Sequence, residues 1–358
     1  MKITKVIGYG LSSPVKGGHT YYGYQSATKN IGIIEVHTDT GLVGFGETYA
    51  GVYCAELIEP TVKYLESYLI GLNLVDIDII NSIPYIGRSG LVKCISSGID
   101  IAIHDILSKA QSVPLYEYLG GDNEIPVYAS NGSAVFTIKQ IEEDVKSILD
   151  KGYTAYKMRI GLQGRFEDLQ RLHTARKHLG SHKLMVDAIM GTNPDKWDYR
   201  TAHQWSRDLE QFNISWLEEP FIPTDVHNYT RLRSVSNVPI AGGEALNQML
   251  EFDLYKDMKA VDIIQPDVTN SGGIKECAEI VSKFGSKNTA MHVWGSQVAI
   301  NANKHFAKAF NVSFLEVPMM ELEINDYITR GNGTGIDIYI SEEVKEKYKL
   351  KTKQNFKL

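Results

Sequence analysis

The sequence predicts an α/β fold: a TIM-type (β/α)7β barrel with an α+β N-terminal capping domain that the C-terminal segment completes. Two observations support this prediction. Strand-like and helix-like patterns alternate from about residue 125 onward, and five acidic residues and one histidine each end a short apolar run, at gaps of 31, 26, 23, 25 and 24 residues. These six are Asp187, Glu218, Glu244, Asp267, His292 and Glu316. Each gap can hold one strand, one helix and two loops, which matches the repeat of an eight-stranded barrel of ~250 residues.

The first part of the chain follows a different pattern, which predicts a capping domain over residues 1–125. An apolar run at 31–38, an Asp-Thr-Gly turn at 39–41 and a second apolar run at 42–47 predict a β-hairpin. Two helices are expected at 56–69 and 90–111, where apolar residues recur every three or four positions. Strands followed by helices, without alternation, favour an α+β domain.

Eight strands and seven intervening helices are predicted for a barrel domain over residues 126–317. The strands are expected at 126–129, 155–160, 183–187, 215–218, 240–244, 263–267, 290–292 and 314–316. The helices include amphipathic segments at 138–149, 166–179, 275–284 and 299–310. Residues 318–358 do not repeat the unit, so we expect this segment to leave the barrel and return to the capping domain.

Composition excludes several classes of function. The formal net charge is −6, and no basic stripe is present apart from lysines near the C-terminus, so nucleic-acid binding is disfavoured. No apolar segment reaches the ~18 residues of a membrane span, and the N-terminus lacks the pattern of a signal peptide. We therefore expect a cytoplasmic enzyme that binds neither nucleic acid nor membrane.

The evenly spaced acids predict a metal site. In such a barrel the catalytic groups come from the C-terminal ends of successive strands, so these carboxylates should converge around one mouth. Converging carboxylates repel one another, and each pKa rises unless positive charge lies among them. Mg2+ prefers oxygen ligands and often shares its remaining positions with an anionic substrate. We therefore expect Asp187, Glu218 and Glu244 to hold Mg2+.

Two cations precede the acidic series by one repeat. Lys157 and Arg159 close the second barrel strand, and side chains two apart on a strand share a face. If either side chain points into the barrel, both do. Buried cations need partners, and the ring of acids would supply them.

The ordered set Lys157, Arg159, Asp187, Glu218, Glu244, Asp267, His292 and Glu316 resembles the mandelate racemase branch of the enolase superfamily, the mandelate racemase/muconate lactonizing enzyme family. Three further segments are similar to motifs of that family: GIDIAIHDILSKAQSVPLYEYLGG at 98–121, WLEEP at 216–220 and MHVWGS at 291–296. The resemblance covers nearly the whole chain. It implies the same three Mg2+ ligands that the charge argument selects.

The resemblance also implies roles for the remaining residues. Asp267 would orient His292, and His292 would exchange the proton next to a substrate carboxylate. Glu316 would form a hydrogen bond at that carboxylate. Glu219 adjoins Glu218 but should face the other way along its strand.

One departure from the family pattern selects the reaction. Racemases of this family usually carry a second lysine where this chain has Arg159, and racemisation needs an acid/base on each face of the substrate. Using arginine as a neutral base at pH 7 costs roughly 8 kcal/mol, because its pKa is about 13. A single His292 can instead take the alpha proton and return it to a leaving beta-hydroxyl. We therefore expect a dehydratase that converts a 2,3-dihydroxy acid sugar into a 2-keto-3-deoxy acid.

Other activities stay open at this point. A racemase or epimerase would need Lys157 or a residue of the cap as its second acid/base. A cycloisomerase would use the same metal-stabilised enediolate. A barrel that binds a carboxylate without turnover is the alternative from outside the enzymes.

Substrate-binding residues are expected at the barrel mouth and in the cap. Residues 14–25 are rich in glycine and tyrosine and are predicted to form a loop over the substrate, with His19, Tyr21 and Tyr22 as its contacts. Residues 49–53 are a second candidate segment. Asn270 is expected either to reach the substrate or to cap the next helix. The expected partner is a small acid sugar, and by analogy with related barrels we expect a homo-oligomer.

Overall fold

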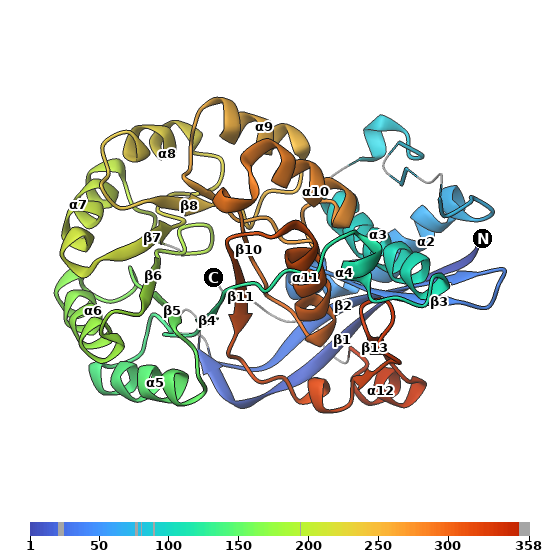
Figure 1. Ribbon diagram of the computed structural model, residues 1–358, viewed down its shortest axis with the longest axis horizontal. Helices are drawn as coiled ribbons and strands as arrows, with labels where there is room; N and C mark the ends of the chain where they lie inside the picture. Colours follow the sequence, from blue (N-terminus) through green and yellow to red (C-terminus); the bar gives the residue numbers. More distant parts are fainter. Residues whose placement is uncertain (21–24, 76–77, 80, 89, 194, 351–358) are drawn as a thin grey trace.

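Eight parallel strands form a barrel in the second part of the chain (Figure 1), as predicted. The computed structural model describes residues 1–20, 25–75, 78–79, 81–88, 90–193 and 195–350. The barrel strands are β4 (Val127–Ser130), β5 (Ala155–Arg159), β6 (Lys183–Asp187), β7 (Ile214–Glu218), β8 (Ile240–Gly242), β9 (Ile263–Ile264), β10 (Ala290–Met291) and β11 (Phe314–Pro318). Neighbours follow chain order from β4 to β9, and β11 joins β10 to β4. A parallel bridge between Ile264 and Thr289 links β9 to the segment before β10.

Several barrel strands are shorter than the sequence suggests. The prediction placed one strand over 263–267, but β9 stops at Ile264. Proline has no backbone N–H, so Pro266 cannot donate a ladder hydrogen bond. β8 is also shorter than the predicted strand over 240–244. It ends at Gly242, and the following residue, Gly243, has a φ of +120°. As a result, several site residues lie just beyond the strand ends, on the segments that enter the following helices.

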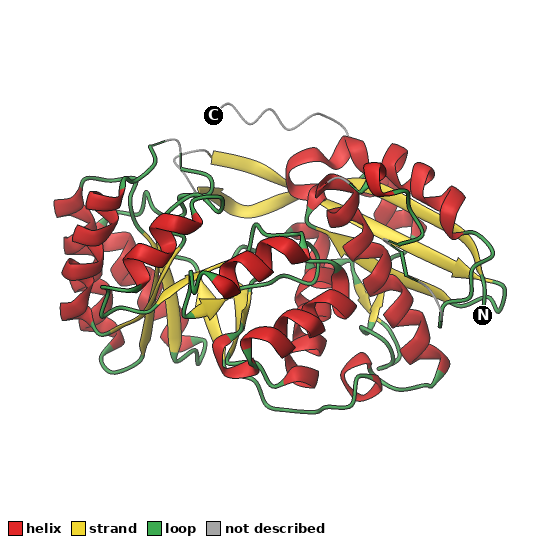
Figure 2. Ribbon diagram, turned by 90° about the horizontal axis from the view of Figure 1, so that it is seen from above, coloured by secondary structure: helices red, strands yellow, loops and turns green. Residues whose placement is uncertain are grey.

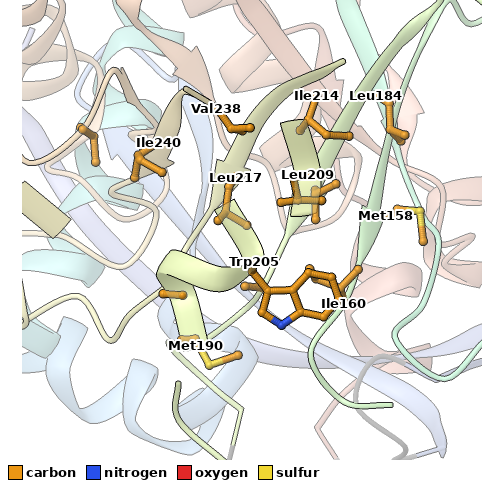
Figure 3. Packing of buried hydrophobic residues seen from close by; sticks show 14 of the residues in the cluster. Met158, Ile160, Leu184, Met190, Trp205, Leu209, Ile214, Leu217, Val238 and Ile240 are labelled. Carbon is orange, nitrogen blue, oxygen red and sulfur yellow. The ribbon is translucent and has the colours of Figure 1, made fainter. Parts of the chain in front are cut away.

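Helices surround the barrel (Figure 1) and bury one face against its strands. They are α5 (Ile138–Asp150), α6 (Arg165–Leu179), α7 (Tyr199–Leu209), α8 (Val226–Arg233), α9 (Met249–Asp257), α10 (Gly273–Phe284) and α11 (Gln297–Phe310). In α5, Thr137 and Gln140 form a capping box, and Ile141, Val145 and Ile148 are buried at helical spacing. Figure 3 shows part of the resulting core, in which Trp205 of α7 belongs to one buried cluster with Met158 and Leu217 of the barrel strands.

The inside of the barrel is filled by large side chains below the site. Tyr128 and Trp216 are buried there and meet edge to face, with ring centroids 5.4 Å apart. Trp216 also donates a hydrogen bond from Nε1 to Glu218 Oε2, at 2.9 Å. The floor of the barrel therefore fixes the position of one acid at its mouth.

The capping domain contains an antiparallel sheet in the order β1-β2-β3, followed by helices. Its elements are β1 (Ile3–Thr20), β2 (Gln25–Thr38), β3 (Val43–Thr48), α1 (Ala50–Cys54), α2 (Ile58–Leu69), α3 (Gly90–Ala110) and α4 (Leu115–Tyr118). A Cβ added at Gly44 or Gly46 would lie 2.0 Å from the carbonyl oxygen of Ala102 or Gly98, respectively. These glycines therefore let β3 pack directly on the backbone of α3.

β1 and β2 form a further hairpin, in addition to the predicted pairing of β2 with β3, and it takes up most of the segment that was predicted to be a loop. Residues 14–20 and 25 belong to its strands, so the prediction of a loop over 14–25 is wrong for them. The prediction missed this because strand pairing is non-local, and the pairing of β1 with β2 overrides the loop-like composition. Figures 1 and 2 show the hairpin extending from the cap over one end of the barrel. Its edge is tied to the barrel, since Lys16 N donates to Glu321 O, just after β11.

The segment after β11 returns to the cap, as predicted. It contains β12 (Thr329–Arg330), β13 (Ile338–Tyr339) and α12 (Glu342–Lys347), and short 3-10 turns lie at 55–57, 85–87, 210–212, 286–288 and 323–326. Ser12 N donates to Tyr348 O at 2.7 Å, and Leu350 N donates to Gly10 O at 3.3 Å. Among the described helices, none combines the length and apolar character needed to cross a membrane.

Candidate active site

Eight polar side chains converge at the C-terminal ends of the barrel strands. Strand register brings the first of them side by side, because Arg159 pairs with Asp187, and Asp187 pairs with Glu218. Lys157 lies on β5 and Glu316 on β11, whereas the remaining three follow the ends of β8, β9 and β10. The complete set is Lys157, Arg159, Asp187, Glu218, Glu244, Asp267, His292 and Glu316. The structure therefore brings together the residues that the spacing selected.

Lys157 lies at the centre of the group. Its Nζ is 2.6 Å from Glu218 Oε1, 2.9 Å from Glu316 Oε1 and 3.6 Å from Asp187 Oδ2. Burial alone would lower the pKa of Lys157, but the surrounding acids, Glu218 first, raise it well above its ordinary value. Lys157 therefore stays charged and is poorly suited to act as a base.

Arg159 is held against the neighbouring strand. Its Nη1 donates to Asn131 O at 2.6 Å and its Nη2 donates to Ser130 Oγ at 3.2 Å. Its Nε lies 3.7 Å from Asp187 Oδ2. These contacts fix a positive charge at the rim of the site, where a substrate oxygen could meet it.

The acids predicted to bind a metal are crowded. Burial and the charge of Glu218 raise the pKa of Asp187 to about 8. The pKa of Glu244 is also raised, mainly by burial. Glu218 is fixed from a second side, because Gln265 Nε2 donates to its Oε2 at 2.7 Å. The oxygen donors and the excess of negative charge fit a hard divalent cation.

The fit to a cation rests on charge and donor type. Among the described residues, no three His, Cys, Asp or Glu side chains are already arranged to hold one ion. Lys157 approaches both Glu218 and Asp187 within 4 Å. Asp187, Glu218 and Glu244 would therefore have to turn toward a metal to share it.

Glu219 does not follow the strand alternation from which its direction was predicted. Its φ of +44° turns the chain out of strand geometry at the end of β7. Burial, followed by the charges of Glu244 and Asp187, raises the pKa of Glu219 well above its ordinary value. Glu219 therefore adds negative charge to the same cluster, and its backbone does not continue the strand alternation from which its direction was predicted.

His292 and Asp267 form a hydrogen-bonded pair. His292 Nδ1 lies 3.0 Å from Asp267 Oδ2. The other oxygen, Asp267 Oδ1, accepts hydrogen bonds from Thr269 N, Thr269 Oγ1 and Asn303 Nδ2, at 2.8 to 2.9 Å. This carboxylate is therefore fixed in position and in turn fixes the imidazole ring.

The second nitrogen of His292 faces the acids at the mouth. Its Nε2 is 3.6 Å from Glu244 Oε2 and 3.9 Å from Glu316 Oε2. Burial would lower the pKa of His292, but Glu244, the hydrogen bond to Asp267 and Glu316 together raise it to about 9. Tyr49 packs against this ring edge to face, with centroids 5.8 Å apart, which places the start of the predicted 49–53 segment at the site.

Glu316 is a hydrogen-bond acceptor in this arrangement. Burial would raise its pKa, but the charges of Lys157 and His292 outweigh burial and lower the pKa to about 2. Its Oε2 accepts a hydrogen bond from Val293 N at 3.1 Å. The carboxylate is therefore ionised across the physiological pH range.

The predicted substrate contacts of the cap and of Asn270 have mixed outcomes. His19 lies on β1 opposite Ser26, and nothing further is described for its side chain, while Tyr21 and Tyr22 lie outside the described residues. Asn270 Nδ2 donates to Glu244 O at 3.0 Å and thereby holds the segment after β8. The N-cap of α10 is Gly272, so the expectation that Asn270 caps this helix is wrong.

Several residues around the site were not found from the sequence. Gln265 interrupts the apolar run before Asp267, and Asn303 lies among apolar residues of α11. A polar residue within an apolar pattern is a sequence signal that could have identified both as partners of the site. Lys29 was also missed. It alternates with Ile31 and Ile33 along β2, which puts it on the apolar face of that strand.

Comparison with known families agrees with this geometry. Residues 140–342 match the sequence model described as "Enolase C-terminal domain-like". Residues 20–120 match "Mandelate racemase / muconate lactonizing enzyme, N-terminal domain".

Curated relatives include three kinds of enzyme. L-talarate/galactarate dehydratase of Salmonella typhimurium is 30% identical over 290 residues, which cover 77% of this chain and 72% of the relative. The 3,6-anhydro-alpha-L-galactonate cycloisomerase of Streptomyces coelicolor is 32% identical, covering 71% and 72%. The N-succinyl-L-Arg/Lys racemase of Bacillus cereus is 28% identical, covering 86% and 84%. A solved structure of the Salmonella dehydratase, liganded with Mg and L-lyxarohydroxamate, has a TM-score of 0.84 and 26% identity, covering 98% of this chain and 93% of the other.

Proposed function

This chain belongs to the mandelate racemase/muconate lactonizing enzyme family of the enolase superfamily and is an enzyme, and we propose that it dehydrates an acid sugar in a Mg2+-dependent reaction. The substrate would be a 2,3-dihydroxy carboxylate, and the product a 2-keto-3-deoxy acid and water. The relatives named as acid-sugar dehydratases support this class.

The observation that carries the proposal is a mouth with one histidine base and no second neutral amine among the catalytic positions. His292 presents Nε2 to the site while Asp267 holds Nδ1. The position that would serve the opposite face in a racemase is occupied by Arg159, whose guanidinium is tied to Ser130 and Asn131. One base can remove a proton and return it to a leaving group, whereas two-base racemisation needs an acid/base on each face.

The proposed reaction follows from these positions. His292 Nε2 takes the proton from carbon 2, and the electron pair moves into the carboxylate to give an enediolate. The protonated His292 then gives that proton to the hydroxyl on carbon 3, which leaves as water. The resulting enol becomes the keto acid when a proton is added at carbon 3.

Two residues would stabilise the charge that develops on the carboxylate. Lys157 and Arg159 bring positive charge that is already fixed in place before the reaction starts. Glu316, which is ionised, would hold Lys157 beside that carboxylate. A divalent cation held by Asp187, Glu218 and Glu244 would supply further positive charge beside the same oxygens.

Purified protein with Mg2+ and a panel of acid sugars in D2O tests the proposal. Release of a 2-keto-3-deoxy acid, measured with semicarbazide, would support it. Deuterium at carbon 2 without loss of water would instead show racemase or epimerase activity, and an isomeric product without either change would show a cycloisomerase. Absence of all three reactions across the panel would contradict the proposal.

A further inference from the structure

The guanidinium of Arg159 is held by a peptide group whose other end meets an acid outside the barrel. Arg159 Nη1 donates to Asn131 O at 2.6 Å. The same peptide bond joins Asn131 to Gly132, and Gly132 N donates to Asp144 Oδ2 at 3.0 Å. All described peptide bonds are trans, so the C=O and the N–H of one peptide point in opposite directions. A guanidinium and a carboxylate therefore hold the two ends of one peptide plane.

Asp144 lies on α5, on the face of the helix that packs against the barrel. It is three residues after Ile141 and four before Ile148, and both of these isoleucines are buried. α5 is one of the helices that surround the barrel (Figure 1), so the Asp144 carboxylate approaches the end of β4 from the outside. A half-buried acid on the apolar face of an amphipathic helix needs hydrogen-bond partners. Packing of the helix alone does not account for an acid at this position.

Among the described residues, three neutral groups donate to Asp144. Besides Gly132 N, these are Asn131 Nδ2, at 2.6 Å from Oδ1, and the Tyr156 hydroxyl, at 2.5 Å from Oδ2. Burial raises the pKa of Asp144, although these hydrogen bonds act in the opposite direction. Hydrogen bonds in a chain polarise one another. The charge of Asp144 therefore strengthens the bond that the carbonyl of the same peptide accepts from Arg159.

The two neighbouring peptides are tied to β5, whereas the peptide between Asn131 and Gly132 is held by side chains. Asn131 N donates to Lys157 O at 3.2 Å, and Arg159 N donates to Gly132 O at 2.9 Å. Gly132 has a φ of +51°, and a Cβ added there would lie 2.5 Å from Met158 Cβ. Glycine allows the peptide before it to face either way, as in the two common types of β-turn. The side chains at its two ends therefore select the direction of this peptide.

We propose that Asp144 is a positioning residue that directs the Arg159 guanidinium toward the substrate, through the peptide between Asn131 and Gly132. This inference rests on the proposed function, in which Arg159 stabilises charge on the substrate carboxylate. Arg159 also approaches an acid of the cation site, with Nε 3.7 Å from Asp187 Oδ2. If the carbonyl turned away, the guanidinium would lose a fixed acceptor and could follow Asp187 as this acid turns toward the cation. Asp144 would thus keep Arg159 in place for the substrate.

Hydrogen exchange at Arg159 tests the proposal in the protein without substrate. The full chain would carry isotope-labelled arginine for NMR, and Arg159→Lys would identify the Arg159 signal by its absence. Asp144→Leu keeps the shape of the side chain but accepts no hydrogen bond. The Nη hydrogens of Arg159 should therefore exchange with water about threefold to tenfold faster, as for the loss of one hydrogen bond.

Tyr156→Phe is the matched control for this experiment. It removes another donor to the same carboxylate and leaves the bond from Gly132 N to Asp144 in place. The melting temperature of this variant should fall, because a buried hydrogen bond is lost. The exchange rate at Arg159 should stay the same. A general loosening of the Asp144 network would accelerate exchange in both variants.

Steady-state kinetics tests whether Asp144 acts through Arg159. Asp144→Leu should lower kcat for keto-acid release by about threefold to tenfold. The same substitution added to Arg159→Lys should lower kcat by less than about twofold, because the guanidinium that the peptide directs is already gone. An equal loss in both backgrounds would show that Asp144 acts on the fold and not on Arg159.

Other outcomes would also overturn the inference. Unchanged Nη exchange in Asp144→Leu, or equal acceleration in Tyr156→Phe, would each do so. If Asp144→Leu does not fold, Asp144→Asn takes its place. Its amide lacks the charge that polarises the peptide, so exchange should be about twofold faster, and an unchanged rate would contradict the proposal.

Keto-acid release by the unmodified protein is measured separately. If release is absent while Asp144→Leu still accelerates exchange at Arg159, the proposed function fails and the positioning role of Asp144 stands. If release occurs and exchange at Arg159 is unchanged, only the role of Asp144 fails.

Discussion

His292 and Asp267 come from the ends of neighbouring barrel strands and meet with Nδ1 3.0 Å from Oδ2. Asp267 Oδ1 is held by Thr269 and Asn303, so this carboxylate has little freedom to turn away. An aspartate in this position fixes the imidazole tautomer and raises the basicity of the free nitrogen. The pair is therefore the first place to test the proposed chemistry.

Asp267→Asn should lower kcat for keto-acid release on the order of 10^2- to 10^4-fold. The amide can hold the ring in the wrong tautomer and no longer stabilises the imidazolium. Steady-state kinetics measures the loss, and Asp208→Asn, at an exposed ion pair with Arg165, is the control. A kcat within threefold of the unmodified protein would show that Asp267 does not orient the base.

Saturating Mg2+ should lower the pKa of His292. Without a cation this pKa is raised to about 9, against the effect of burial, with Glu244 making the largest favourable contribution. A cation shared by Glu244 would cancel that contribution, so the pKa should fall by about one unit or more. A pH titration by NMR, with His292→Asn to assign the signal, measures the shift. An identical pKa with and without Mg2+ would place the metal elsewhere.

Asp187→Asn should raise the melting temperature of the metal-free protein, by on the order of 2 °C. Burial and Glu218 raise the pKa of Asp187 to about 8, so its ionised form destabilises the fold at pH values above the unfolded pKa. The same variant should lose the melting-temperature increase that Mg2+ gives to the unmodified protein. Calorimetry with and without EDTA gives both values, and a Mg2+ response kept in the variant would remove Asp187 from the ligand set.

Arg159→Lys should introduce proton exchange at carbon 2. A lysine at this position supplies an amine that can lose a proton, which arginine does not at neutral pH. The variant also loses the fork of hydrogen bonds to Ser130 and Asn131, so dehydration should fall about tenfold or more. Incubation in D2O with mass spectrometry would detect deuterated substrate. If no exchange appears above that of the unmodified protein, the identity of residue 159 does not select the reaction.

Stability should fall between pH 6.5 and pH 4 because of His305. Burial, with Lys304 and Lys308, lowers the pKa of His305 to about 4, while the unfolded chain has a pKa near 6.5. In this window the unfolded state binds more protons, so stability is present above pH 6.5 and is lost as the pH falls, by at most about 3 kcal/mol. His305→Gln keeps an acceptor for Tyr116 N and should flatten this part of the stability curve measured with urea. An equally steep curve in the variant would exclude His305 as the cause.

The barrel could be predicted because its local signals agree with its topology. Residues such as Asp187 and Glu218 end their strands, and parallel strands deliver their ends to one rim. Prediction from local composition failed for segments whose secondary structure depends on pairing with a strand distant in the sequence. Residues 14–20 look like a loop, but pairing of β1 with β2 makes them strand.

The charged residues of the site could be predicted from the sequence, but the hydrogen bonds that hold them in place could not. The acids and His292 could be found from their spacing, whereas Gln265 and Asn303 act only through contacts that the fold creates. Strand alternation does not extend to Glu219, because alternation holds only while the backbone stays extended, and its φ of +44° ends that condition. Lys29 could not be connected to the barrel from sequence, since more than two hundred residues separate it from Asp267 and His292.

The hydrogen bond from Ser12 N to Tyr348 O joins two segments that are 336 residues apart in the chain (348 − 12). During translation the edge of β1 emerges 336 residues (348 − 12) before the residue that covers it. An uncovered strand edge is a site for unwanted association, so the nascent chain carries this exposure until the segment returns. The cap is thus begun before the barrel is synthesised and is completed only after it.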